Sequence, residues 1–402
     1  MKLGILREGK VPPDRRVPLT PLQCREVQQK FSHVKVLVQP STDRCYTDHE
    51  YRDTGIDISE DLSACDVLLG VKEVPPEQLV PDKTYLFFSH TTKQQEYNRL
   101  LLQTILRKRI RLIDYELLTD NEGFRIIGFG RFAGIVGAYN GIRALGLRNG
   151  TFYLEPAHKC EDLDELFKQL NHIKPDPVKI AVTGNGRVAN GTFEVLDNLK
   201  MIRLLPEDFI NISQPDRPYY TQLLPGDYVK RKDGKPFNLL HFFEHPDLYE
   251  NAFLPYARST DFLISAAYWD PRAPVLFTSE EMRQNDFSIK IISDITCDIE
   301  GSVPSTKRPS TIDEPFYDYN PETGELEPPF NSEKNITVQA VDNLPNELPK
   351  DASEDFGKNL IDKVFPYLLN DKGDEIIERA VIAKNGVLMP RFKYLQAFAE
   401  GI

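Results

Sequence analysis

The chain has 402 residues, of which 40% are hydrophobic and 27% are charged, and its formal net charge is −12. This length is enough for about two or three domains with sizeable cores. The negative charge argues against non-specific binding to nucleic acid or to an anionic membrane, and no apolar run is long enough to span a membrane. The composition therefore predicts a globular protein with neither nucleic acid nor membrane as a partner.

Cysteine usage indicates a reducing compartment. The five cysteines are scattered, without a C-x-x-C pair, at Cys24, Cys45, Cys65, Cys160 and Cys297. This pattern disfavours a zinc site or a redox motif. The opening MKLGILREGK lacks the apolar core of a signal peptide. Free thiols, no bound metal and a cytoplasmic location are therefore expected.

Short apolar segments alternate with helical patterns over the first 137 residues. The expected strands are residues 2–6, 34–38, 66–71, 85–88 and 110–114, and the expected helices include residues 21–31 and 93–107. Strands that alternate with helices indicate a mostly parallel sheet with helices on its faces.

Polar side chains follow three of these strands. Lys72 and Glu73 lie in GVKEVP, His90 ends TYLFFSH, and Asp114 and Glu116 lie in LIDYELL. Ligands of open α/β sheets bind beyond the carboxyl ends of the strands. A lysine whose pKa is balanced by burial, a cationic neighbour and nearby carboxylates can act as a general base, and histidine adds a second acid/base group. In the alternative interpretation, Lys72 is an exposed charge and His90 is a hydrogen-bonded turn residue.

A glycine-rich loop lies in the middle of the chain, in the segment KIAVTGNGRVANGTFEVL at residues 179–196. Its apolar start predicts a buried strand, Gly184 and Gly186 predict a tight turn, and the residues that follow predict a helix. This order suits a dinucleotide, because glycines let the backbone approach the pyrophosphate and a helix N-terminus offers free N–H groups. The pattern Gly-x-Gly-x-x-Ala often occurs by chance, and here the strand and the helix around it support it.

The remaining segments form a second lobe and a return to the first. Residues 131–148 are expected to form one helix with small residues on a packed face, which connects the lobes. Strands are expected at 262–267 and 289–292, an insertion at 206–250, a strand and loop at 336–344, and helices at 354–370 and 373–383 that pack on the first lobe.

The sequence leaves the choice of dinucleotide and the carboxylate contacts open. The acid expected about 20 residues beyond the glycine loop, which would bind the ribose, has Glu207 and Asp208 as its nearest candidates. Arg203 lies nearby, without the arginine cluster that would hold a 2′-phosphate, so NAD is favoured and NADP is possible. Arg15, Arg16 and Arg125 are candidates for binding a substrate carboxylate through two bonds, although surface arginines are common.

Several ordered motifs resemble the alanine dehydrogenase and saccharopine dehydrogenase superfamily. They span nearly the whole chain and read LRE…RRVPLTP, GVKEVP, FFSHTTK, LIDYELLTD…GFRIIGFGRFAG, SDIT at 293–296 and VDNLPNELPKDASEDFG at 341–357. Within this group the chain most resembles lysine-forming saccharopine dehydrogenases, and in particular the lysine–ketoglutarate reductase half of bifunctional lysine-degrading enzymes. The segment 206–250, AAYW at 266–269 and STIDEPFYDY at 310–319 are similar to that half.

This resemblance implies two Rossmann-like α/β lobes with mainly parallel sheets and an active-site cleft between them. The substrate and catalytic lobe would comprise residues 1–137 and 337–402, and the dinucleotide-binding lobe residues 138–336. The implied reaction interconverts saccharopine, NAD(P)+ and water with L-lysine, 2-oxoglutarate and NAD(P)H. The partners would be a small amino acid and a 2-oxo acid, bound by a monomer or small homo-oligomer.

The resemblance also implies residue roles. Lys72 would accept the proton of the secondary amine, His90 would act as acid and base on the carbinolamine, and Glu73 and Glu116 would tune both. The residues implied to contact the substrate are Arg16, Gln95, Arg125 and Phe129. The residues implied to bind the cofactor are Gly184, Gly186, Arg187, Asp208, Tyr268, Trp269 and Asp294.

Two other functions stay open. One is an amino-acid dehydrogenase of the alanine dehydrogenase type, whose smaller substrate needs fewer carboxylate contacts. The other is a nucleotide-binding regulator without turnover, which the presence of Lys72, His90, Glu73 and Glu116 disfavours.

Overall fold

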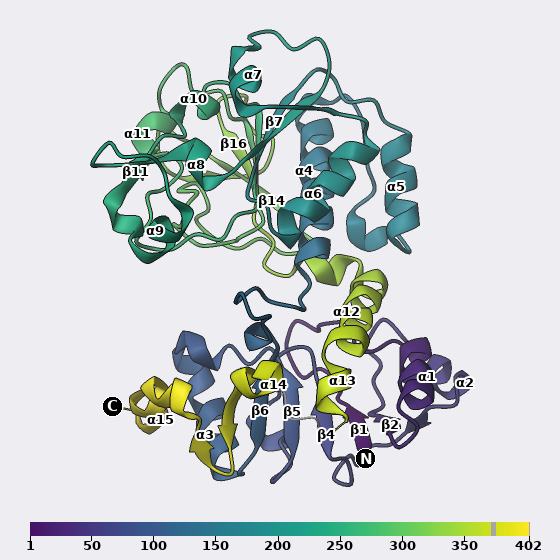
Figure 1. Cartoon of the computed structure of the whole chain (residues 1–402). Helices are drawn as coiled ribbons and strands as arrows, with labels where there is room; N and C mark the ends of the chain where they lie inside the picture. Colours follow the sequence, from purple (N-terminus) through teal and green to yellow (C-terminus); the bar gives the residue numbers. More distant parts are fainter. Residues whose placement is uncertain (371–374, 402) are drawn as a thin grey trace. The chain divides into compact units, whose positions relative to one another are not determined.

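The chain forms two compact units in the computed structural model, which describes residues 1–370 and 375–401 (Figure 1). Unit 1 comprises Met1–Phe129 and the chain from Pro349 onward, and unit 2 comprises Gly130–Leu348. The predicted divisions at residues 137 and 337 lie inside helix α4 (Gly130–Asn149) and strand β16 (Ile336–Gln339). Both elements belong wholly to unit 2, so the units divide at the ends of secondary-structure elements.

Unit 1 is built on an eight-stranded sheet in the order β18-β17-β6-β5-β4-β1-β2-β3. Its strands are β1 (Lys2–Ile5), β2 (Lys35–Val38), β3 (Asp57–Ile58), β4 (Val67–Leu69), β5 (Thr84–Phe87), β6 (Arg111–Asp114), β17 (Val381–Lys384) and β18 (Val387–Leu388). The strands from β6 to β3 are parallel, and β17 and β18 add antiparallel pairs. Every strand predicted in the first 137 residues corresponds to one of these.

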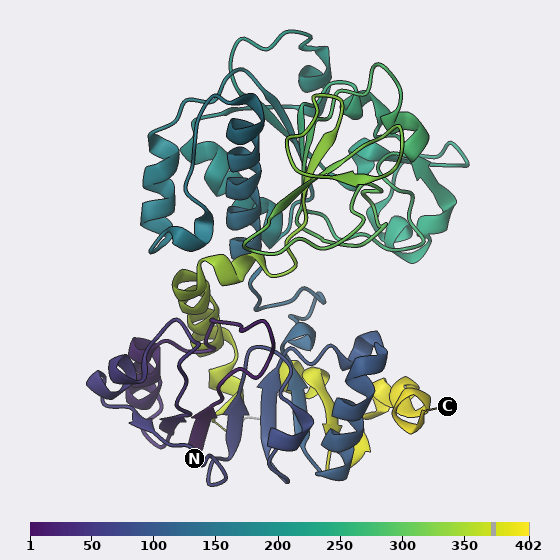
Figure 2. The same cartoon turned by 180° about the vertical axis from the view of Figure 1, so that it is seen from behind.

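Helices cover both faces of the unit 1 sheet. They are α1 (Pro21–Lys30), α2 (Asp48–Asp53), α3 (Arg99–Arg107), α12 (Pro349–Lys363), α13 (Phe365–Leu368), α14 (Glu375–Ala380) and α15 (Gln396–Glu400). One core contains Val27 of α1 and Phe356 of α12, and a second contains Leu102 of α3 and Phe398 of α15. In Figure 2, the blue α3 and the yellow α15 lie side by side. None of the described helices is long and apolar enough to cross a membrane.

The C-terminal segment departs from the prediction of a helix over residues 373–383. Helix α14 is followed directly by strand β17, and residues 373 and 374 lie outside the described part of the chain. Val381, Ile382 and Ala383 are fully buried, and β17 pairs with β6. A short apolar run suits a buried strand or a buried helix equally, so pairing with a strand distant in sequence decides between them.

Unit 2 contains an eight-stranded sheet in the order β15-β14-β16-β13-β12-β7-β9-β8. Besides β16, its strands are β7 (Lys179–Thr183), β8 (Ile202–Leu204), β9 (Tyr219–Leu223), β12 (Phe262–Ser265), β13 (Ile291–Asp294), β14 (Phe316–Tyr319) and β15 (Leu326–Glu327). The strands from β16 to β8 are parallel, and β14 and β15 are antiparallel additions. The predicted class of two mainly parallel α/β sheets is therefore confirmed.

The segment 206–250, predicted as an insertion, lies only partly outside this sheet. It contains β9, which pairs with both β7 and β8. Beyond β9 the chain forms α8 (Pro225–Tyr228), α9 (Leu239–Glu244) and the hairpin of β10 (Val229–Arg231) and β11 (Tyr249–Asn251). The part outside the main sheet therefore starts after Leu223.

Helix α4 and helix α6 (Arg187–Asn198) pack closely, side by side in Figure 1. A Cβ on Gly134 would overlap the carbonyl oxygen of Val188, and one on Gly191 would overlap that of Arg131. The small residues predicted on a packed face of α4 thus allow the close approach of α6, which begins at the glycine loop. The other helices of this unit are α5 (Leu163–Asn171), α7 (Pro206–Asn211), α10 (Leu254–Ala257) and α11 (Ser279–Met282).

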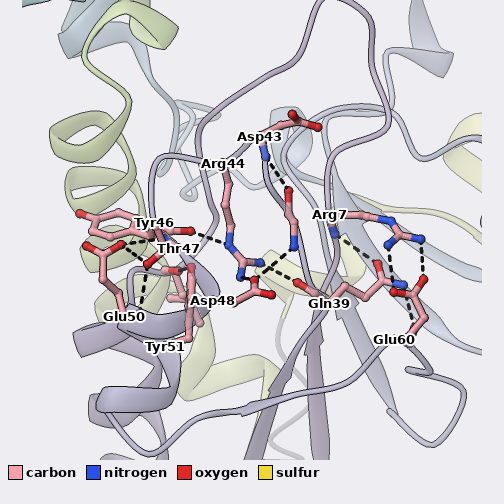
Figure 3. A network of polar contacts seen from close by, with 12 residues as sticks. Arg7, Gln39, Asp43, Arg44, Tyr46, Thr47, Asp48, Glu50, Tyr51 and Glu60 are labelled. Atoms are coloured by element: carbon pink, nitrogen blue, oxygen red, sulfur yellow. Dashed lines mark hydrogen bonds and ion pairs between the residues drawn. The ribbon is translucent and has the colours of Figure 1, made fainter.

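A polar network fixes the loop between β2 and α2 in unit 1 (Figure 3). The guanidinium of Arg44 donates to the carbonyl oxygens of Gln39 (2.6 Å) and Tyr46 (2.7 Å) and pairs with Asp48. Its Cζ atom also lies 4.5 Å from the ring centre of Tyr51. Because the donors of this buried arginine are used within the protein, we assign Arg44 to the fold and not to a ligand site.

Candidate active site

At the carboxyl edge of the unit 1 sheet, an ionisable residue follows each of four strands. Strands β2 and β3 lie on one side of β1, and β4, β5 and β6 lie on the other, so the chain changes direction across the sheet between β1 and β4. Such a switch point is where open α/β sheets bind ligands. Glu8 follows β1, Lys72 follows β4, His90 follows β5 and Glu116 follows β6. The structure thus brings three predicted residues to one edge, together with Glu8, which sequence reasoning missed.

Glu73 and His90 form a pair at this edge. The Nδ1 atom of His90 is hydrogen bonded to Oε1 of Glu73, and only 16% and 15% of the two side chains are exposed. Burial acts to raise the pKa of Glu73, but the hydrogen bond and the charge of His90 outweigh it, so this pKa lies below its ordinary value. When Glu73 accepts a hydrogen bond from Nδ1 of His90, the Nε2 atom of His90 is left to exchange protons.

Asp114 holds two strand ends in place. Its side chain is fully buried and accepts hydrogen bonds from the N–H of Ser89 (3.0 Å) and the N–H of Glu116 (2.8 Å). Burial raises the pKa of Asp114, and the hydrogen bond from the Ser89 hydroxyl reduces this rise. Because Ser89 follows β5 and Glu116 follows β6, this one carboxyl sets the positions of His90 and Glu116 relative to each other.

Glu116 lies beside two cations. Its Oε1 atom is 3.3 Å from Nη2 of Arg125 and 3.8 Å from Nζ of Lys93. The side chain of Glu116 is 13% exposed and that of Arg125 is 55% exposed, so the arginine side of this pair is open to solvent. Gln95 is also exposed, and its side chain accepts a hydrogen bond from the hydroxyl of Tyr97 (2.6 Å). Two residues predicted to contact the substrate therefore present exposed polar side chains.

Arg16 and Phe129 occupy a more buried position. Arg16 is 3% exposed, and its Nε and Nη2 atoms donate to the carboxylate of Asp14 at 2.9 and 2.5 Å. Its guanidinium lies 4.1 Å from the ring centre of Phe129, which stacks in turn on Phe356 at 4.4 Å. The structure thus brings these two predicted residues into contact. Sequence reasoning missed Asp14, and its place two residues before Arg16 was the available signal.

In unit 2 the glycine loop occupies the corresponding switch point, between β7 and β12. Gly184 has a positive φ of 99°, and a Cβ there would lie 3.1 Å from the carbonyl oxygen of Ala266. Gly186 precedes Arg187, the first residue of α6, makes no side-chain cap, and would have nothing within 4 Å of an added Cβ. A helix start without a side-chain cap, with open space beside it, fits the pyrophosphate of a dinucleotide.

A mostly apolar cavity of about 230 Å³ lies beside this loop. Its lining includes Thr183 at the end of β7, Ser265 at the end of β12, and the aromatic residues Tyr228, Phe242, Phe243, Tyr268 and Trp269. A hydrogen bond from Nε1 to the carbonyl oxygen of Pro274 (3.2 Å) fixes Trp269, whereas Tyr268 is 87% exposed. Aromatic walls near a helix N-terminus fit a planar base linked to phosphate, so the residues of unit 2 fit a nicotinamide dinucleotide.

Two acids that were predicted to bind the cofactor have other surroundings. Asp294 ends β13 but is fully buried, and its carboxylate accepts bonds from the hydroxyls of Thr296 and Thr306, each at 2.6 Å. Burial raises the pKa of Asp294, and these hydroxyl bonds oppose the rise. Asp208 is exposed in the first turn of α7, which follows the edge strand β8. Asp294 therefore fixes the loop after β13, and the strand that precedes Asp208 is separated from β7 by β9.

On the side of β7 away from β12 lies β9, which the sequence did not predict. Gln222 on β9 donates to the carbonyl oxygen of Gly184 at 2.8 Å, and Arg203 on β8 donates to the side-chain oxygen of Gln222. Arg203 is exposed, and its Cζ atom lies 5.3 Å from the ring centre of Phe193. A cation is thus linked through one residue to the glycine loop. The aromatic and β-branched residues Tyr219, Tyr220 and Thr221 were the available signal for this strand.

Comparison with known proteins gives the relatives of this chain. Residues 4–136 match the family described as Alanine dehydrogenase/PNT, N-terminal domain. The chain is 31% identical to an alpha-aminoadipic semialdehyde synthase of Arabidopsis thaliana over 98% of its own length, and it covers 41% of that protein. It is 23% identical to a saccharopine dehydrogenase (NAD(+), L-lysine-forming) of Emericella nidulans, with 92% of each chain covered. The chain thus spans less than half of the first relative and nearly all of the second.

The fold has solved counterparts as well. An L-alanine dehydrogenase aligns with 98% of this chain and 99% of its own, with a TM-score of 0.66 and 15% identity. At this identity the likeness shows the fold alone. The matched domain, and the relatives that align with more than nine-tenths of this chain, agree with the ordered motifs. The chain is therefore similar to the alanine dehydrogenase and saccharopine dehydrogenase superfamily, and within it to the lysine-forming saccharopine dehydrogenases.

Proposed function

We propose that the chain is an oxidoreductase of the lysine-forming saccharopine dehydrogenase type. It would interconvert saccharopine, NAD(P)+ and water with L-lysine, 2-oxoglutarate and NAD(P)H. The observation that carries this proposal is the grouping of Lys72, Glu73, His90 and Glu116 at the carboxyl edge of the unit 1 sheet, after the neighbouring strands β4, β5 and β6. The similarity to the saccharopine dehydrogenase of Emericella nidulans supports it.

The first step of this reaction needs a proton acceptor. Oxidation of a secondary amine to an imine removes a hydride from carbon and a proton from nitrogen. A bound nicotinamide supplies the hydride acceptor, and we assign the proton to the Lys72 amine. One positioned acid/base group of this kind typically contributes about 10²–10⁴-fold to the rate.

The second step needs a group that gives and takes protons. Water adds to the imine carbon, and the carbinolamine then separates into amine and 2-oxo acid. His90 suits both events, because Glu73 holds its Nδ1 atom and leaves Nε2 to exchange protons. Glu116 lies between the cations Arg125 and Lys93 and would set the charge around this centre.

The substrate carboxylates need cationic contacts. Arg125 is the better candidate of the two arginines implied to contact the substrate, because its side chain is 55% exposed while that of Arg16 is buried against Asp14. A planar guanidinium binds a carboxylate through two parallel bonds. Arg16 would act through Phe129, on which it stacks.

A second candidate is an amino-acid dehydrogenase of the alanine dehydrogenase type. The matched N-terminal domain favours it. Its substrate would have a single carboxylate, so Arg125→Ala would change its turnover little. In the leading candidate the same substitution would raise KM for 2-oxoglutarate.

NAD, with NADP possible, is the proposed cofactor, held by the glycine loop and the aromatic cavity of unit 2. Hydride transfer requires contact between the nicotinamide and the substrate. An active-site cleft between the two lobes is therefore part of the proposal. A cytoplasmic location is also a proposal, supported by five free cysteines.

Oxidation of NADH and NADPH, followed by the loss of nicotinamide absorbance, tests the proposed reaction. We expect oxidation in the presence of 2-oxoglutarate to depend on added L-lysine, and comparison of the two dinucleotides gives the cofactor preference. Pyruvate with ammonia is the parallel assay. Turnover in that assay with none in the presence of L-lysine would replace the leading candidate by the second.

A further inference from the structure

Glu8 contacts the backbone of the proposed base. Its Oε1 atom accepts a hydrogen bond from the N–H of Val71 (2.7 Å), and its Oε2 atom accepts one from the N–H of Lys72 (2.8 Å). Two successive amides thus point to the two oxygens of one carboxyl group. An ionised carboxylate accepts through both oxygens, and its charge strengthens both bonds.

Glu8 also joins the two strands on either side of the switch point. It follows β1, its bonds reach the segment after β4, and these two strands pair along their length. From the other side, the N–H of Phe88 donates to the carbonyl oxygen of Val71 (3.0 Å), and His90 binds the side chain of Glu73. The segment that carries Lys72 is therefore held from β1 by Glu8 and from β5 by Phe88 and His90.

The surroundings of Glu8 oppose its ionisation. Burial has the largest effect and the carboxylate of Asp14 adds to it, whereas the two backbone bonds and the charge of Arg16 act the other way. Together they raise the pKa of Glu8 to about 8. Burial and then the charge of Glu8 raise the pKa of Tyr115, whose buried hydroxyl has no hydrogen-bond partner among the described residues. Glu8 thus changes charge near neutral pH, at the point where it binds Lys72.

We infer that Glu8 is a positioning residue, whose ionised carboxylate fixes the backbone of Lys72 and thereby the place from which the Lys72 amine acts. This inference rests on the proposed function only in taking Lys72 as the base. Protonation of Glu8 turns one acceptor oxygen into a hydroxyl and weakens one of the two amide bonds. Lys72 is therefore held more firmly above the pKa of Glu8 than below it.

Amide hydrogen exchange in the full chain tests this contact without any substrate. At a pH above the Glu8 pKa of about 8, we expect Glu8→Gln to speed exchange at the Val71 and Lys72 amides on the order of tenfold, because glutamine offers one acceptor oxygen and no charge. Glu60→Gln removes the charge of an exposed carboxylate paired with Arg7, and it should leave both amides unchanged. The buried strand β12 reports any general loss of folding. Equal exchange at the two amides in Glu8→Gln and the wild type would overturn the inference.

Kinetics separates positioning from a general structural role. Above the Glu8 pKa of about 8, we expect kcat of Glu8→Gln to fall on the order of tenfold while KM for the dinucleotide stays within roughly twofold. The limb of the wild-type pH profile near the Glu8 pKa of about 8 should disappear in this variant. Glu8→Asp keeps the charge and should keep the limb and recover part of kcat.

The two experiments fail in different ways. A Glu8→Gln profile with the limb unchanged overturns the role of Glu8. The second possible result is faster amide exchange in Glu8→Gln together with a wild-type chain that has no lysine-dependent turnover. That result overturns the proposed reaction and leaves the contact between Glu8 and the Lys72 backbone in place.

Discussion

The Lys72 side chain is the group on which the proposed proton transfer depends. Lys72→Met keeps an unbranched side chain but removes the amine, so we expect kcat to fall by about 10²–10⁴-fold with the fold retained. Circular dichroism checks the fold, and Lys30→Met, at an exposed pair with Asp362, is the matched control. Turnover that is equal in the Lys72→Met variant and the wild type would exclude lysine as the base.

Glu73 links the site to stability through pH. The pKa of Glu73 is lower in the folded chain than its ordinary value of 4.5. Its stabilising effect is therefore complete above pH 4.5 and is lost as the pH falls through the lower folded value. We expect Glu73→Gln to lower the free energy of unfolding by about 1 kcal/mol near neutral pH, and this difference to shrink at acidic pH.

Urea denaturation at several pH values measures this difference. Glu96→Gln, at a carboxylate that is 76% exposed beside Arg99, is the control and should change stability little at any pH. A stability difference for Glu73→Gln that stays constant across the acidic range would contradict the assignment.

We propose Arg203 as the residue whose charge would distinguish NADPH from NADH. A 2′-phosphate gains from a guanidinium linked to the glycine loop, whereas a ribose hydroxyl gains little. We therefore expect Arg203→Ala to raise KM for NADPH on the order of tenfold and KM for NADH far less. Initial rates with both dinucleotides measure the effect, and equal changes in the two KM values would rule out this role.

At the residue scale, the sequence predicted groups that stand at strand ends and missed groups that act through backbone contacts. Lys72 and His90 follow apolar runs and are visible as polar side chains at their ends. Glu8 was passed over because its partners are two backbone amides in the segment after β4, which is distant in sequence. The position of Asp208 depends on strand order, which local sequence does not encode.

At the element scale, the packing of α4 on α6 positions the helix that starts at the end of the glycine loop. A Cβ on Gly134 would overlap the carbonyl oxygen of Val188. We expect Gly134→Ala to lower the free energy of unfolding by about 1–3 kcal/mol, since the helices have to separate, and to weaken dinucleotide binding. Denaturation and titration with NADH measure the two effects.

Gly55→Ala is the comparison for this substitution. Gly55 has a positive φ of 82° and nothing within 4 Å of an added Cβ, so its cost comes from backbone strain alone. We expect it to leave dinucleotide binding unchanged. Unaltered binding in Gly134→Ala would mean that the α4–α6 contact does not control the loop.

Strands were easier to predict from the sequence than the pairing between them. Apolar runs bounded by turn residues identified β1, β2, β4, β5 and β6, because burial requires such runs. Strands β9 and β17 were missed, since β9 lies in a segment rich in proline and charge, and β17 continues directly from a helix. Their pairing with β7 and β6 is a tertiary contact.

At the scale of the whole molecule, unit 2 is continuous in sequence and unit 1 is not. Unit 2 has its own sheet and core, so we expect residues 130–348 to fold alone and to bind NADH. Circular dichroism and NADH fluorescence measure folding and binding. An unfolded fragment would show that unit 2 depends on unit 1.

The pairing of β17 with β6 bears on the order of events at the ribosome. Until residues 381–384 emerge, β6 presents an unpaired sheet edge, and the core beside it lacks Phe356 and its neighbours on α12. Unit 2 is synthesised during this interval. The first 129 residues of the nascent chain therefore expose an unpaired, aggregation-prone strand edge while more than two hundred further residues are translated. Unit 1 is started first and completed last, so chaperones that act during synthesis should bind mainly to unit 1.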